Sequence, residues 1–112
     1  MEQRCISAEC LSTTGFSYTL SLINGKFKMT ILYTLMEFGT VRFNEMKKYI
    51  GAISYKTLSA TLKELESDGL VNRKEYPQIP PKVEYSLTDR GRSLIPILDA
   101  MCEWGSANRM DK

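Results

Sequence analysis

The strongest constraint in the sequence is a helical hydrophobic pattern near the middle of the chain that is followed at once by two strand patterns. Leu58, Leu62 and Leu65 recur at the spacing of one helix face. Ser54 precedes them and is a good N-cap, because its hydroxyl can accept a hydrogen bond from a free backbone N–H of the first turn. The pattern therefore predicts an amphipathic helix over residues 54–68.

The two strand patterns lie on either side of a run that neither a strand nor a helix tolerates. Residues 70–76 alternate in part, and Val83, Tyr85 and Leu87 alternate with polar residues. Between them, residues 77–81 (PQIPP) contain prolines, which lack the backbone N–H that a ladder needs. We therefore expect a β-hairpin with an extended tip that the prolines stiffen.

Helical periodicity recurs in other parts of the chain, and it predicts helices over residues 18–23, 26–37, 43–49 and 88–108. Pro96 falls inside the last of these and is expected to kink it. Two helices joined by a tight turn and followed by a hairpin form a winged helix-turn-helix. We therefore predict an α+β, mostly helical fold, with a flexible polar arm over residues 1–14 and one domain over residues 15–110.

Composition narrows the possible functions. The chain has 112 residues, enough for one domain, and a net charge of only +2. It contains no histidine, which removes His-based zinc sites and the usual Ser–His and Cys–His catalytic pairs. We expect no enzyme activity, no metal and no cofactor. No apolar run reaches the roughly 18 residues of a membrane helix, and the N-terminus lacks a signal-peptide core, so we expect a cytoplasmic protein.

Several short blocks resemble one family, the HxlR family of bacterial transcriptional regulators. They are residues 25–28 (GKFK), 42–45 (RFNE), 62–71 (LKELESDGLV), 76–88 (YPQIPPKVEYSLT), 91–94 (GRSL) and 102–105 (CEWG). The resemblance implies a dimeric winged helix-turn-helix that binds a palindromic operator as repressor or activator. It also implies that oxidants or electrophiles such as quinones can act through cysteine, although Thr14-Gly15 stand where family sensors commonly have Cys-Pro.

The helix over residues 54–68 is the predicted recognition helix. Its face opposite the leucines carries small and cationic side chains, which suit the base edges of the major groove. Tyr55 and Lys56 lie in the first turn, where a recognition helix reaches bases, and Lys63 is expected at a phosphate. The full predicted DNA-binding set is Arg42, Ser54, Tyr55, Lys56, Ser59, Ala60, Lys63 and Lys82. The alternative interpretation is a merely solvated helix face.

The last predicted helix carries more apolar surface than a small domain can cover. We expect it to form a homodimer interface with the first helix, through Ile97, Leu98, Met101 and Trp104. A twofold dimer would hold its two recognition helices ~34 Å apart, one turn of DNA. The alternative is an ordinary core helix.

Three cysteines are candidates for redox or electrophile sensing. Cys102 follows Leu98 by one helical turn, so a buried, small hydrophobic role is expected for it. Cys5 and Cys10 lie in the polar arm, and Cys5 is the first choice because Glu9 beside Cys10 disfavours a thiolate. An arm cysteine could react alone with an electrophile or meet Cys102 of the partner subunit.

Three functional hypotheses follow. The first is a sequence-specific repressor of double-stranded DNA that a thiol switch controls. The second is the same DNA-binding role controlled by a non-covalent small ligand at the dimer interface. The third is a winged helix used for protein–protein assembly, and it predicts no steep salt dependence of DNA binding, whereas phosphate contacts demand one.

Overall fold

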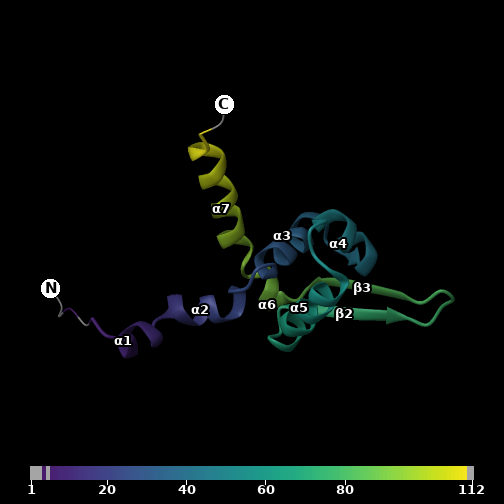
Figure 1. Cartoon of the computed structure of the whole chain (residues 1–112), viewed down its shortest axis with the longest axis horizontal. Helices are drawn as coiled ribbons and strands as arrows, with labels where there is room; N and C mark the ends of the chain where they lie inside the picture. The colour runs from purple at the N-terminus through teal and green to yellow at the C-terminus, as the bar shows by residue number, and fades with distance from the viewer. Residues whose placement is uncertain (1–3, 5, 111–112) are drawn as a thin grey trace.

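The computed structural model describes residues 4 and 6–110, and several of its helices pack around one small antiparallel sheet (Figure 1). The elements in chain order are α1 (Ala8–Ser12), α2 (Gly15–Ile23), α3 (Lys28–Phe38), β1 (Val41–Arg42), α4 (Phe43–Ile50), α5 (Tyr55–Ser67), β2 (Val71–Tyr76), β3 (Lys82–Leu87), α6 (Asp89–Arg92) and α7 (Ile95–Asn108). This order confirms the predicted winged helix-turn-helix, with α4 and α5 as the helix pair and β2–β3 as the wing.

The sheet is antiparallel with the strand order β1-β3-β2, so β3 lies in the centre. Tyr85 on β3 pairs with Val41 on one side and with Arg73 on the other. Because direct cross-strand partners point to the same face of a sheet, Tyr85 and Arg73 lie on the same face. This register becomes important for the site described below.

The core lies between α3, α4, α5 and the sheet. The predicted stripe of Leu58, Leu62 and Leu65 is fully buried there, as expected. Ser54 caps α5 as predicted, accepting a hydrogen bond from the backbone N–H of Thr57 at 3.0 Å. The face of α5 opposite the leucines therefore points away from the core, in a fixed orientation.

Three predictions about the ends of the chain need correction. The arm contains a helix, α1, and α2 begins at Gly15 instead of residue 18, because the Thr14 hydroxyl accepts a hydrogen bond from the Ser17 N–H. Pro96 kinks no helix. The chain forms two helices there, α6 and α7, and Pro96 lies in the first turn of α7, where a missing N–H costs nothing.

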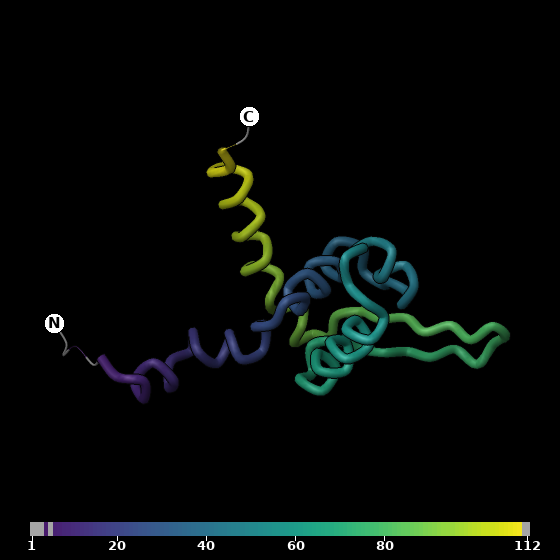
Figure 2. Tube along the Cα trace, in the orientation of Figure 1, coloured from purple at the N-terminus to yellow at the C-terminus, as the bar shows by residue number. Residues whose placement is uncertain are grey.

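The helices α2 and α7 extend away from the rest of the molecule in different directions (Figure 2). The radius of gyration is 16.9 Å, whereas about 13 Å is typical of a compact domain of about 100 residues. Apolar side chains on both helices consequently remain uncovered within the chain. Among the described residues, no helix is long and apolar enough to cross a membrane.

Candidate DNA-binding surface

The first turn of α5 is held in place by α4. Tyr55 is exposed, and its ring stacks on Phe43 with the ring centroids 6.1 Å apart. The amino group of Lys47 lies 4.9 Å from the Tyr55 ring centroid on the same helix pair. These contacts fix the Tyr55 ring beside the exposed side chain of Lys56, so the N-terminal end of the predicted recognition helix has a defined surface.

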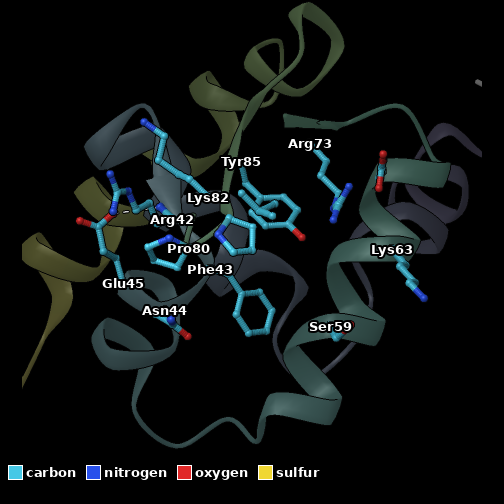
Figure 3. Close-up of a pocket in the computed structure, with 13 residues that line it drawn as sticks. Arg42, Phe43, Asn44, Glu45, Ser59, Lys63, Arg73, Pro80, Lys82 and Tyr85 are labelled. Carbon is cyan, nitrogen blue, oxygen red and sulfur yellow. Dashed lines mark hydrogen bonds between the residues drawn. The ribbon is translucent and has the colours of Figure 1, made fainter. Parts of the chain in front are cut away.

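A cleft of about 800 Å³ lies between α5, the start of α4 and the wing (Figure 3). It brings together four residues of the predicted DNA-binding set: Arg42, Ser59, Lys63 and Lys82. The other members, Ser54, Tyr55, Lys56 and Ala60, are exposed on α5 and do not line the cleft. The predicted residues thus divide into an exposed helix face and a cleft beside it.

Two carboxylates also line the cleft, Glu45 and Glu66. Glu45 has a structural task, because its Oε1 accepts a hydrogen bond from the Arg42 backbone N–H at 2.9 Å at the start of α4. A third carboxylate on α5, that of Glu64, lies 3.9 Å from the amino group of Lys28, a largely buried lysine of α3.

Lys82, the wing residue in the predicted set, forms an ion pair within the wing. Its amino group lies 3.6 Å from Oε2 of Glu84 and 4.3 Å from the ring centroid of Tyr76. The Tyr76 hydroxyl donates to Oε1 of the same Glu84 at 3.0 Å. In Figure 3 the amino group of Lys82 points away from the centre of the cleft.

Arg73 on β2 is a cleft residue that the sequence interpretation did not include. The pKa of Arg73 is raised, and the interaction of its guanidinium with Tyr85 is the main cause. A second contact joins it to Oε1 of Glu75 at 3.3 Å. The available signal was strand alternation, since Arg73 has the same parity along β2 as the buried Val71 and therefore faces α5.

The cysteines differ from their predicted environments. Cys102 was expected to be buried, but its thiol is free and exposed on α7. It lies close to Tyr33 of α3, whose pKa is raised mainly by the charge of Glu37 and then by Cys102. Cys10 is partly buried in α1 and is not a free thiol. Cys5, the first choice for sensing, lies outside the described residues.

Three of the four predicted dimer residues are exposed on α7. Ile97, Met101 and Trp104 present apolar surface, and Trp104 is 70% exposed. Leu98 departs from the prediction: it is only 5% exposed because it packs into the core of its own chain. On α2, the exposed large side chains include Phe16, Tyr18 and Leu20.

Comparisons with known proteins agree with this geometry. The model of the HxlR-like helix-turn-helix family matches residues 22–112. An uncharacterised HTH-type transcriptional regulator of Halalkalibacterium halodurans is 63% identical over 99 residues, covering 88% of each chain. The uncharacterised HTH-type transcriptional regulator YdzF of Bacillus subtilis is 58% identical over 92 residues, covering 82% of this chain and 84% of YdzF.

Solved structures give the same result. The redox regulator HypR in its oxidised form superposes with a TM-score of 0.80 at 45% identity, covering 88% of this chain and 100% of HypR. The reduced form of the transcriptional regulator YodB from B. subtilis gives 0.72 at 32% identity, covering 88% and 96%. The resemblance inferred from the sequence is confirmed: the chain belongs to the HxlR-like helix-turn-helix family and is a transcriptional regulator of the helix-turn-helix type.

Proposed function

We propose that this regulator acts in the cytoplasm as a homodimer that binds a palindromic operator and represses transcription. Residues 15–110 would form the DNA-binding and dimerisation domain, with residues 1–14 as an arm. The observation that carries the proposal is the exposed face of α5, which lies directly beside a cleft lined by cationic side chains and ended by the wing. A helix of this kind fits the major groove, and the flanking cations neutralise phosphates.

Within this surface, Lys56, Ser59 and Ala60 are the proposed base-reading residues. Lys56 and Ala60 are exposed on α5, and Ser59 is partly exposed at the edge of the cleft. Their short or flexible side chains allow close approach to base edges. Arg42 and Lys63 are assigned to backbone phosphates.

The proposed dimer interface follows from apolar surface that the chain leaves uncovered. Large apolar side chains are exposed together on two helices, which is unusual for scattered surface residues. They are Ile97, Met101 and Trp104 on α7 and Phe16 and Leu20 on α2. A second copy of the chain would cover these faces. It would also place two copies of α5 on successive turns of the same face of DNA.

The test of the DNA-binding surface is an operator selected from a random duplex library, with affinities measured by fluorescence anisotropy. Lys56→Ala is expected to weaken binding by about 1–3 kcal/mol and to relax sequence preference, as the loss of a base contact does. Lys26→Ala is the matched control, because Lys26 is exposed outside this surface, beside the ring of Phe27. Equal effects of the two substitutions would contradict the assignment of α5.

We also propose that oxidants or electrophiles such as quinones switch DNA binding through cysteine. Two observations support this: Cys102 carries an exposed free thiol, and the redox regulator HypR and the diamide-treated YodB are among the similar structures. In the oxidative route, which starts from the fully reduced chain, the thiols of Cys5 and of Cys102 of the partner subunit would lose two protons and two electrons to form a disulfide, while the N=N bond of diamide is reduced. An electrophile would instead alkylate one thiolate.

This switch is tested by intact mass and operator affinity before and after treatment with diamide or a quinone. The wild-type protein is expected to lose affinity, and diamide is expected to produce a reducible covalent dimer. Cys5→Ser is expected to retain its affinity under both treatments, and Cys102→Ser is expected to form no covalent dimer. The same loss of affinity in Cys5→Ser as in the wild type would exclude Cys5 as the sensing residue.

A further inference from the structure

The position of the cleft determines which part of a DNA duplex can enter it. The major and minor grooves of B-DNA are separated by one sugar-phosphate backbone. If α5 occupies the major groove and the wing reaches the neighbouring minor groove, that backbone strand has to pass between α5 and the wing. The space between them is the cleft of about 800 Å³ in Figure 3. This step rests on the function proposed above.

Arg73 is placed to meet that backbone. It lies on the face of β2 directed toward α5, opposite Tyr85 in the strand register. Its side chain is 40% exposed, and Figure 3 shows the guanidinium directed into the space between Tyr85 and α5. Tyr85 itself is only 7% exposed, so its hydroxyl is a fixed point at the edge of the core.

We propose that Arg73, held in place by Tyr85, is the wing residue that binds a backbone phosphate of the operator. A guanidinium carries five N–H donors in a planar fork, so the hydrogen bond to Glu75 leaves donors for a phosphate. The cross-strand neighbour Tyr85 and the hydrogen bond to Glu75 limit the positions of the guanidinium before DNA arrives, which lowers the entropy lost on binding.

The other cations of the wing lie differently. Lys82 and Lys74 belong to the opposite face of the hairpin by strand parity, and their amino groups lie 4.3 Å and 5.2 Å from the ring centroid of Tyr76. Lys82 is also paired with Glu84 at 3.6 Å. Arg73 is therefore the wing cation that the fold directs at the backbone strand, and Tyr85 is its positioning residue.

The test is the salt dependence of DNA binding by Arg73→Met, measured on the selected operator and on a random duplex of equal length. Each phosphate contact contributes about 0.9 to the slope of log affinity against log salt concentration. Arg73→Met is expected to lower this slope by about one contact on both duplexes and to leave the ratio of the two affinities unchanged. Lys74→Met is the matched control, because it removes a cation from the adjacent position of the same strand, and its slope is expected to equal that of the wild type.

A second variant separates the phosphate contact from a structural role. Tyr85→Phe retains the buried ring and the Arg73 charge, so the slope is expected to persist while affinity falls roughly 2- to 10-fold, the range for the loss of one polar contact. An unchanged slope in Arg73→Met, or a loss confined to the operator, would overturn the proposal. If the wild-type protein itself bound DNA without salt dependence, the proposed function would fail first, so the two failures are distinguishable.

Discussion

Replacement of Gly91 by alanine tests how firmly α6 is attached to the junction of α5 and β2. A Cβ at this position would lie 2.1 Å from the backbone oxygen of Leu70 and 3.1 Å from a methyl group of Leu87. The same Leu70 oxygen accepts the N–H of Thr88 at 3.1 Å, and the Thr88 hydroxyl donates to the Gly69 oxygen at 2.6 Å. The contact therefore involves backbone that several hydrogen bonds hold in place.

The magnitude follows from what has to move. Relief of an overlap of this size requires α6 to shift away from the junction of α5 and β2, which strains the packing by roughly 1–3 kcal/mol. The shift also weakens the Thr88 hydrogen bonds, each worth about 0.5–1.5 kcal/mol. We expect Gly91→Ala to lower the free energy of unfolding by about 2–4 kcal/mol, which corresponds to a decrease in Tm of roughly 8–16 °C for a domain of this size.

The assay is thermal unfolding followed by circular dichroism, with all variants at one protein concentration because the Tm of a self-associating protein depends on concentration. Gly15→Ala is the control, since a Cβ at Gly15 in the first turn of α2 would meet nothing within 4 Å. A Gly91→Ala protein that melted at the same temperature as Gly15→Ala would refute the reasoning, because it would mean that α6 can move without cost.

Two further predictions concern the core and the titration of a tyrosine. Leu62 is only 1% exposed, so Leu62→Ala is expected to lower the free energy of unfolding by about 2–5 kcal/mol, measured by urea denaturation. The pKa of Tyr33 is raised in the folded chain, chiefly by Glu37, so the unfolded chain releases this proton first and stability is lost as the pH rises above about 10. Tyr33→Phe is expected to reduce that loss, and equal pH dependence in both proteins would contradict the assignment.

Local patterns were sufficient to predict most of the fold. Three features depend only on residues close together in the sequence: the buried leucines of α5, its Ser54 cap and the alternating burial along β3. The structure confirms all three. Local caps and periodicity also predicted the order of helices and strands, because proline and glycine interrupt the chain at defined positions.

The ends of the chain were harder to predict because tertiary contacts decide them. The sequence predicts a continuous helix with a kink at Pro96. In the structure α6 ends at Arg92 instead, because Thr88 and Gly91 hold this short helix against the α5–β2 junction. Cys102 follows Leu98 by one turn on α7, but only Leu98 reaches the core, because the helix leaves the body of the molecule beyond it.

The candidate DNA-binding surface shows the same division between local and long-range information. The exposed face of α5 was predictable, since the leucine stripe determines which side chains point outward. The role of the wing cations was not predictable, because whether a cation is free to bind phosphate depends on its neighbours across the hairpin. Lys82 contacts Glu84 and Tyr76, whereas Arg73 lies beside Tyr85. Strand parity would have separated the two residues, but only the register of β2 on β3 identifies Tyr85 as the group that holds Arg73 toward the cleft.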